Sequence, residues 1–360
     1  MTDAARLAAA EKGERKAFAR DRRRDRPRAL ASWLLAVAAL VFLMVIVGGI
    51  TRLTESGLSI VRWEPVSGIV PPLSQADWMI EFHAYRQSPE YREVNAGMTL
   101  AEFKRIYFWE YVHRLLGRII GLAFALPLAW FAVKRAIPTG YGVRLVALLA
   151  LGALQGAVGW WMVASGLVDR PEVSHIRLAV HLLLALFIFA GLVWTALDLR
   201  ALARDPEAAP ARMPTLAIWL LSLLGLQLMF GAYVAGLEAG HAYASWPKMG
   251  ERWFPEGAPM LEPFMRNFAD NPIVVQFVHR WLAFIVAGVA FWFAARLWRR
   301  GLALEAQLVV WAVALQILLG IATLLAGVRF ELALAHQAMA ALLLAAIVQA
   351  AHRMGQGRSA

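Results

Sequence analysis

Four histidines stand near the starts of four different apolar segments of the sequence: His113, His181, His279 and His336. An imidazole inside a membrane-spanning helix is costly to bury and usually faces the interior of the helix bundle. Neutral imidazole is a good axial ligand for haem iron, and facing helices of a four-helix bundle can supply two of them. A histidine satisfied within its own helix would explain one such residue better than four. The two histidines of each half therefore predict two bis-histidine haem sites.

Zinc fits these residues less well than haem does. A closed zinc site takes four protein ligands and a catalytic one commonly three, whereas each half of the chain offers two histidines. The chain contains no cysteine. Disulfides, thiolate metal ligands, iron–sulfur clusters and thioether-attached haem are therefore excluded.

The elements that carry the histidines are expected to be membrane-spanning helices. The chain of 360 residues is 60% hydrophobic, which is unusual for a soluble protein. About 20 apolar residues cross a bilayer as a helix, and eight segments are long enough. The predicted spans lie near residues 31–51, 107–132, 144–166, 178–198, 214–236, 274–296, 305–326 and 332–351.

The basic residues predict how these helices are oriented. Arginine and lysine are concentrated before the first span, in the connections near residues 134–144, 200–212 and 296–300, and in the C-terminal tail. All of these segments fall on one side of an eight-helix chain, and the positive-inside rule makes that side cytoplasmic. We expect a multi-pass membrane protein with both termini cytoplasmic and the histidines toward the opposite, outer side. Topology explains the net charge of +11, so nucleic acid is not expected as a partner.

The two halves of the chain repeat each other. Shared features are the spacing of Gly48, Glu55, Gly57 and Trp63 with that of Gly231, Glu238, Gly240 and Trp246, the pairs His113-Arg114 and His279-Arg280, and the Leu-Gln phrases that precede Gly159, Gly231 and Gly320. Two units of four helices have the same orientation in a membrane, so equivalent residues lie at equal depth. Each histidine is then expected about 5–12 Å below the start of its helix. The glycines are expected to let helices pack closely.

The predicted fold is an all-α polytopic membrane protein with eight transmembrane helices in two pseudo-symmetric four-helix bundles. Its predicted parts are a basic cytoplasmic tail (1–30), an N-terminal bundle (31–200) with an outer loop (52–106), a C-terminal bundle (201–352) with an outer loop (237–273), and a cytoplasmic tail (353–360). The aromatic residues of the first outer loop favour an ordered cap over the membrane.

One difference between the halves bears on chemistry. Glu110 shares a helix face with His113, whereas the equivalent residue before His279 is Gln276. A carboxylate near a reacting centre can accept a proton or stabilise positive charge, and a neutral glutamine suits a site that only holds a cofactor. The alternative is an ion pair between Glu110 and Arg114 on the helix surface.

The remaining ionisable residues leave alternatives open. Arg114, Arg118 and Arg280 lie in or at the edges of spans, where guanidinium groups either bind the propionates of a haem or extend to the membrane interface. The other four histidines are expected to be solvated: His83, His175, His241 and His352.

Several phrases of the sequence resemble a known family. They are Thr51-Arg52-Leu53-Thr54-Glu55-Ser56-Gly57-Leu58-Ser59, Glu110-Tyr111-Val112-His113-Arg114, Trp246-Pro247-Lys248-Met249, Gln276-Phe277-Val278-His279-Arg280 and His336-Gln337. Over roughly residues 31–350 the chain resembles the haem A synthases shared by alphaproteobacteria and mitochondria, in their cysteine-free branch.

This resemblance implies an activity and its residues. Such enzymes oxidise the C8 methyl group of haem O to a formyl group, through a hydroxymethyl intermediate, for cytochrome oxidase. His279 and His336 would ligate haem b, and haem O would bind near His113 and His181 with Glu110 important for turnover. Arg114 and Arg280 are expected near propionates.

The resemblance also implies partners and leaves rival functions. Expected partners are haem O synthase, an electron donor such as ferredoxin or quinol, cytochrome oxidase assembly factors and the lipid bilayer, while a homo-oligomer is left open. One rival is a di-haem b electron-transfer protein of the quinol oxidoreductase type. The other is a haem transporter or chaperone that releases haem unchanged.

Overall fold

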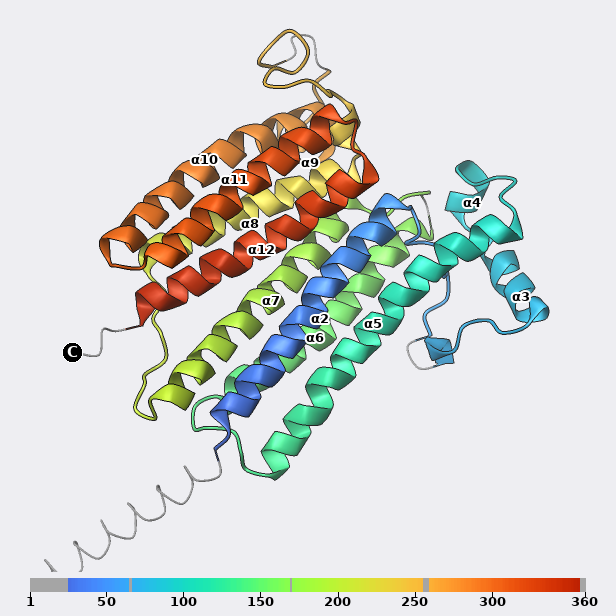
Figure 1. The fold of residues 1–360 in the computed structure, drawn as a ribbon. Coiled ribbons are helices and arrows are strands. Elements are labelled where there is room, and N and C mark those ends of the chain that lie inside the picture. Colours follow the sequence, from blue (N-terminus) through green and yellow to red (C-terminus); the bar gives the residue numbers. More distant parts are fainter. Residues whose placement is uncertain (1–24, 65–66, 169, 255–258, 357–360) are drawn as a thin grey trace, which may run out of the picture.

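The computed structural model describes residues 25–64, 67–168, 170–254 and 259–356 (Figure 1). Most of the predicted tails, residues 1–24 and 357–360, therefore lies outside the described residues. The described ends of both tails are helical instead, because the first long helix begins at Pro27 and the last ends at Gly355. Secondary structure within the described ranges is helical, apart from one isolated bridge between Met249 and Arg252.

Eight helices of the described chain are long and apolar enough to cross a membrane, which confirms the predicted number of spans. They are α2 (Pro27–Leu53), α5 (Leu100–Val133), α6 (Gly142–Val163), α7 (His175–Arg204), α8 (Thr215–Gly236), α10 (Pro272–Arg299), α11 (Ala303–Leu325) and α12 (Phe330–Gly355). Three short helices lie in the outer loops: α3 (Gln75–Tyr85), α4 (Pro89–Glu93) and α9 (Asn267–Asp270).

Helix α5 begins well before its apolar stretch. Thr99 and Glu102 form a capping box, in which each side chain accepts a hydrogen bond from the backbone of the other, and this starts the helix at Leu100. At about 1.5 Å per residue, His113 lies about 20 Å from the helix start, so the expected 5–12 Å is wrong for this residue. The other three histidines lie six or seven residues after their helix starts, within the expected depth.

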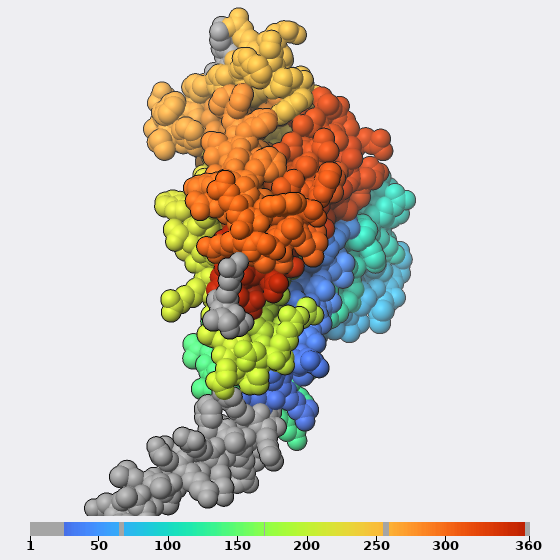
Figure 2. Space-filling model, turned by 60° about the vertical axis from the view of Figure 1, so that its left-hand side comes forward, coloured from blue at the N-terminus to red at the C-terminus, as the bar shows by residue number. Residues whose placement is uncertain are grey.

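The long helices lie in two groups (Figure 1). The first group, α2, α5, α6 and α7, is made from the first half of the chain, and the second group, α8, α10, α11 and α12, from the second half. The groups meet where α12 packs against α2 and α7, and where α7 packs against α8. In the space-filling view the orange and red helices of the second group lie along the blue and green helices of the first (Figure 2).

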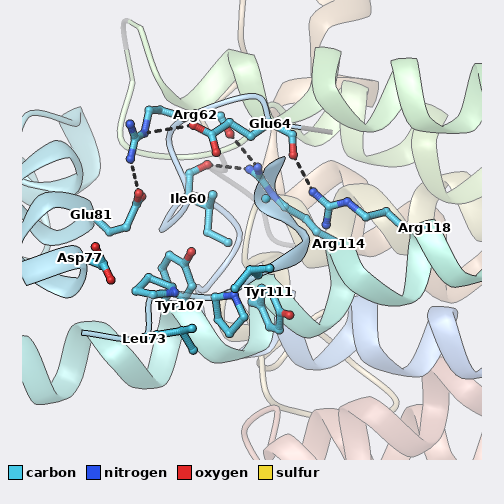
Figure 3. A pocket seen from close by; sticks show the side chains of 14 residues that line it. Ile60, Arg62, Glu64, Leu73, Asp77, Glu81, Tyr107, Tyr111, Arg114 and Arg118 are labelled. Carbon is cyan, nitrogen blue, oxygen red and sulfur yellow. Dashed lines mark hydrogen bonds and ion pairs between the residues drawn. The ribbon is translucent and has the colours of Figure 1, made fainter. Parts of the chain in front are cut away.

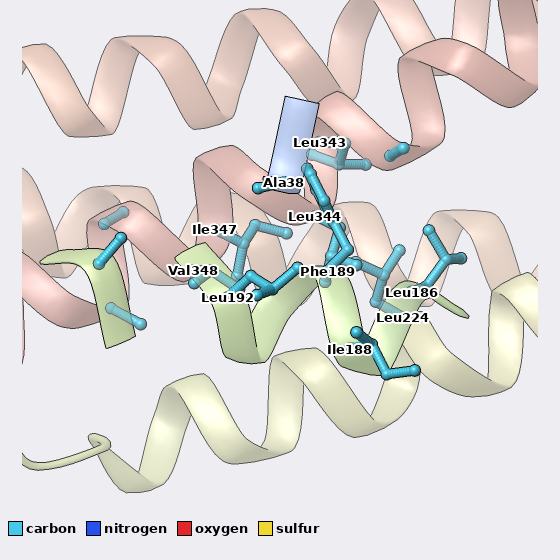
Figure 4. Close-up of a cluster of buried hydrophobic side chains, with 14 of the residues drawn as sticks. Ala38, Leu186, Ile188, Phe189, Leu192, Leu224, Leu343, Leu344, Ile347 and Val348 are labelled. Atoms are coloured by element: carbon cyan, nitrogen blue, oxygen red, sulfur yellow. The ribbon is translucent and has the colours of Figure 1, made fainter. Parts of the chain in front are cut away.

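The junction between the groups is filled with apolar side chains (Figure 4). Leu192 of α7 and Ile347 of α12 are almost completely buried there, with Leu224 of α8 and Ala38 of α2 beside them. Inside a membrane such contacts hold helices together through close packing, because lipid tails are as apolar as the side chains. The junction therefore fixes the two groups against each other.

The first outer loop forms an ordered cap, as its aromatic residues predicted. Phe82 and Tyr85 of α3 pack against Phe103 and Tyr107 on the part of α5 that precedes the apolar stretch. Glu90 of α4 is buried in this cap and accepts a hydrogen bond from the Tyr85 hydroxyl at 2.9 Å. Burial raises the pKa of Glu90 to about 7.

Candidate functional site

The fold brings the four membrane histidines together in two pairs. His113 of α5 and His181 of α7 lie near enough for their charges to interact, and so do His279 of α10 and His336 of α12. All four side chains are half-buried. The described residues contain no cluster of three or more histidines, cysteines or acidic residues suited to a metal ion. Each helix group offers two neighbouring imidazoles, which is the donor set of a bis-histidine haem.

Each imidazole lies against a glycine on a neighbouring helix. A Cβ atom added at each glycine would lie close to the ring carbon Cε1 of the histidine that the glycine contacts. The distance between these two atoms is 3.2 Å for Gly48 and His113, 2.9 Å for Gly159 and His181, 3.1 Å for Gly231 and His279, and 2.8 Å for Gly320 and His336. These distances are shorter than ordinary carbon–carbon contacts. The glycines thus make room for the imidazole rings, a more specific role than the helix packing expected from the sequence.

Three of the imidazoles also contact a glutamine one turn before that glycine. The Nε2 atoms of Gln155, Gln227 and Gln316 lie 3.1, 3.1 and 3.3 Å from Nδ1 of the histidine, and 3.4, 3.5 and 3.4 Å from its Nε2. A nitrogen almost equidistant from both ring nitrogens cannot lie in the ring plane without colliding with the carbon between them. Each amide therefore lies over the face of its ring and does not occupy the in-plane direction in which a ring nitrogen binds a metal.

His113 is the exception among the four. Its Nδ1 lies 3.3 Å from the hydroxyl of Thr51, which donates its own proton to the main-chain oxygen of Val47 at 2.9 Å. A hydroxyl has one proton, so Thr51 can only accept a hydrogen bond from His113. The proton then belongs on Nδ1, and Nε2 of His113 is left to bind a metal. This role of Thr51 was not predicted from the sequence.

Glu110 is buried one turn before His113, with 3% of its surface exposed. Its Oε1 accepts hydrogen bonds from Arg114 at 2.6 and 3.0 Å. Its Oε2 accepts from the Ser59 hydroxyl and from the Ile60 N–H, both at 2.7 Å. The ion pair considered from the sequence is therefore formed, but inside the protein rather than on the helix surface.

Gln276 occupies the equivalent position in the second group, and it donates hydrogen bonds where Glu110 accepts them. Its Nε2 donates to the main-chain oxygen of Tyr243 at 3.1 Å and lies 3.5 Å from that of Gly240. Both positions thus hold an outer loop against a helix. The first does so with a carboxylate that accepts, and the second with a neutral amide that donates.

The three arginines of the span edges also bind outer loops. Arg114 donates to the main-chain oxygens of Ile60 and Arg62, and Arg118 donates to that of Glu64. In the second group, Arg280 donates to the main-chain oxygens of Tyr243 and Ser245. These contacts fix the loops over the histidine-bearing helices. A contact with a propionate stays a prediction for these residues.

A cavity of about 260 Å³ lies between α3, α5 and the first outer loop (Figure 3). Its lining includes Tyr107, Tyr111 and Arg114 of α5, together with an ion pair between Arg62 and Glu81. That pair raises the pKa of Arg62, through both the hydrogen bond and the charge of Glu81. Because Arg114 lines this cavity and also binds Glu110, the cavity adjoins the buried carboxylate.

Two histidines that were expected to be solvated are largely buried and connect the helix groups. His352 of α12 is 1% exposed, and its Nε2 lies 2.9 Å from a carboxylate oxygen of Asp198 in α7. His175, the first residue of α7, lies 3.3 Å from Asp270 in the second outer loop. The expectation was wrong because partners far away in the sequence bury these side chains. His83 and His241 are exposed, as expected.

The sequence of this chain was compared with those of known proteins and has several relatives. Residues 31–348 match the COX15-CtaA family, described as cytochrome oxidase assembly protein. A protein of Rhizorhabdus wittichii named "Heme A synthase" is 58% identical over 329 residues, which cover 91% of this chain and 94% of that protein. Proteins with the same name from Sphingopyxis alaskensis and Novosphingobium aromaticivorans are 55% and 51% identical, over 92% of this chain and 93% and 96% of their own lengths.

Proposed function

This chain belongs to the COX15-CtaA family of cytochrome oxidase assembly proteins, and from this premise we infer that it is a haem A synthase. It is an oxidoreductase of haem A biosynthesis and a multi-pass membrane protein with eight apolar helices. Its reaction is the oxidation of the C8 methyl group of haem O to a formyl group through a hydroxymethyl intermediate. The resemblance noted in the sequence is thereby confirmed.

We propose that the first helix group binds the substrate. Haem O would be held between the half-buried rings of His113 and His181, which lie near each other. The single observation that carries this assignment is Glu110, a buried carboxylate one turn from His113 that has no acidic counterpart in the second group. The oxidation of a carbon atom releases protons and develops positive charge. A carboxylate can accept a proton and stabilise that charge.

The second helix group would hold a resident haem b between His279 and His336. The donor set fits, because each of the two imidazoles has a glycine that leaves room for the ring and an amide over its face. Haem b, when bound, would supply one-electron transfer. Gln276 keeps the second outer loop in place without adding a charge or a proton acceptor beside His279.

The surroundings of Glu110 suit a fixed electrostatic role. Arg114 holds Oε1, while Ser59 and Ile60 hold Oε2, so the carboxylate needs no reorganisation as charge develops on the substrate. Oε2 is the atom we propose as the proton acceptor, with the Ser59 hydroxyl fixing its position. The same contacts close the loop over the site, so that bulk water is kept from the substrate carbon.

We propose the bacterial inner membrane as the location, with cytoplasmic termini and histidines toward the periplasm. The distribution of basic residues supports this topology: Arg204, Arg299 and Arg300 lie at helix ends opposite the histidine-bearing ends. Haem O synthase would supply the substrate. A ferredoxin or quinol would be the electron donor, and oxidase assembly factors would receive the product.

Extraction of haems from the purified protein tests this function. Wild type and the variants Glu110→Ala and Gln276→Ala would be expressed with a source of haem O, and their haems separated by chromatography. We expect haem b with haem A or its hydroxymethyl precursor in wild type and in Gln276→Ala. In Glu110→Ala we expect haem b with accumulated haem O. Two haem b per chain, unchanged by either substitution, would instead indicate an electron-transfer protein, and haem O released unchanged by wild type would indicate a transporter.

A further inference from the structure

The phrase that contacts the imidazoles occurs four times, with one variation. Leucine and glutamine followed four residues later by glycine occur at residues 154–159, 226–231 and 315–320. The first helix carries the same pattern at residues 43–48, but there Met44 replaces the glutamine. All four glycines lie against a histidine ring. The imidazole without an overlying amide is therefore His113.

The glutamines restrain the histidines at two points. Gln155 and Gln227 place Nε2 over the ring, and the same Nε2 donates to the main-chain oxygen of that histidine at 3.0 Å. The Oε1 atoms of all three glutamines are buried without a hydrogen-bond partner. Burying an amide oxygen without a hydrogen-bond partner costs free energy. A supporting side chain kept in place despite this cost fixes the orientation of the ring that it covers.

The surroundings of His113 are less restrictive. The methyl end of Met44 lies toward Gly117, one turn beyond His113, at 3.6 Å from the position a Cβ would take there. A thioether is flexible and offers the ring no hydrogen-bond donor. The contact with Thr51, at 3.3 Å, is the hydrogen bond that holds this ring. A single hydrogen bond to Thr51 therefore restrains the His113 ring, whereas a glutamine amide covers each of the other three imidazoles.

We propose that Gln155, Gln227 and Gln316 are positioning residues that lock three haem ligands, and that His113, beside Met44, is the exchangeable ligand of the substrate site. The reasoning rests on the proposed function. A resident cofactor needs both ligands fixed, and the second group has two glutamines. A substrate must be released as product in every cycle, so at least one of its histidine ligands must be able to dissociate. The first group has one glutamine.

Matched substitutions test this inference through the rate of haem loss. Apomyoglobin in excess accepts haem that leaves the protein, and the transfer is followed by absorbance. Met44→Gln adds the missing amide, with Met44→Leu as a control for size. Gln316→Met and Gln227→Met remove an amide from the second group. Loss of such a supporting contact typically weakens metal binding by about 10-fold to 100-fold.

We expect Met44→Gln to slow release of haem O from the first site by roughly tenfold, while Met44→Leu releases it at the wild-type rate. Gln316→Met and Gln227→Met should speed the loss of haem b to a similar extent and change its low-spin electron paramagnetic resonance signal, which a purely structural role would leave alone. The second pair keeps the test decisive if Met44→Gln does not fold. Unchanged release rates in Met44→Gln, or in both glutamine variants, would overturn the proposal.

These outcomes are separable from failure of the proposed function. Release rates are measured with haem O loaded into the purified protein and need no turnover. A protein that makes no haem A but shows the expected rates would contradict the enzyme assignment alone. A protein that makes haem A with equal release rates in all variants would contradict only the exchangeable ligand.

Discussion

The two helix groups share one construction and differ in the polar groups around it. Each places two imidazoles near each other, with a glycine against every ring. Beside its first histidine the first group has a buried carboxylate, and the second has a neutral amide. The first group lacks one covering glutamine, and the second has both. In the proposed assignment, a few added or missing polar groups would turn the same haem-holding framework into a reaction site.

The outer loops differ in the same sense. The first loop folds into a cap with the buried carboxyl group of Glu90. The second loop is organised by two buried amides, in which Asn271 donates to Asn267 and to the main-chain oxygen of Pro259. The charge of Glu90 changes near neutral pH, whereas the two amides do not ionise. The first cap is therefore expected to loosen as the pH rises.

The largest effect is expected from exchanging the residues that differ between the groups. Glu110→Gln should lower haem A formation by about 100-fold or more, because it removes the proton acceptor and its charge. Gln276→Glu should add no chemistry to the second group, whose extracted haem remains haem b. Chromatography of extracted haems measures both. Oxidation of the second haem in Gln276→Glu, or full activity in Glu110→Gln, would contradict the division of roles.

The second effect is a loosening of the first cap as the pH rises. The folded protein raises the pKa of Glu90 from 4.5 to about 7, chiefly through burial, so folding favours the protonated carboxyl group. Cap stability should therefore be full below pH 4.5 and fall as the pH rises to about 7, by about 3 kcal/mol in total.

Hydrogen exchange of α3 and α4 as a function of pH checks this expectation, with the second outer loop as an internal reference. Glu90→Gln should abolish the dependence, because the amide cannot ionise. The interpretation fails if the second loop loosens over the same pH range, or if Glu90→Gln leaves the dependence intact.

The smallest effect is expected from filling the space opposite the rings. Gly320→Ala and Gly159→Ala would push a methyl group against His336 and His181, at a cost of about 1–3 kcal/mol in haem binding. Gly225→Ala and Gly156→Ala are matched controls, since nothing lies within 4 Å of their added Cβ atoms. Haem titration of the four variants measures the difference. Equal losses in all four would show that the ring contacts carry no weight.

The sequence predicted the membrane helices and the histidine pairs for physical reasons. Spans follow from the length of apolar segments, and the pairing follows from the order of the repeats. It did not predict the start of α5 at Leu100, because a capping box outside the apolar stretch determines it.

Contacts between distant segments were harder to predict. The burial of His352 depends on Asp198 of another helix, and the hydrogen bond of Thr51 to His113 depends on how two helices face each other. The Leu-Gln phrases were visible in the sequence, yet only the fold places their amides over the imidazoles. Arg114 and Arg280 were expected to contact haem propionates, and in the structure they donate hydrogen bonds to main-chain oxygens of the outer loops.

The most direct test of the account is the haem content of four single variants: His113→Ala, His181→Ala, His279→Ala and His336→Ala. Each would be purified with a haem O source, and its haems extracted and quantified per chain. The account predicts that the variants of His279 and His336 lose haem b, while the variants of His113 and His181 keep it and lose haem O and haem A. Loss of haem b from the first-group variants, with haem b retained in the second-group variants, would contradict the assignment of substrate and cofactor to the two helix groups.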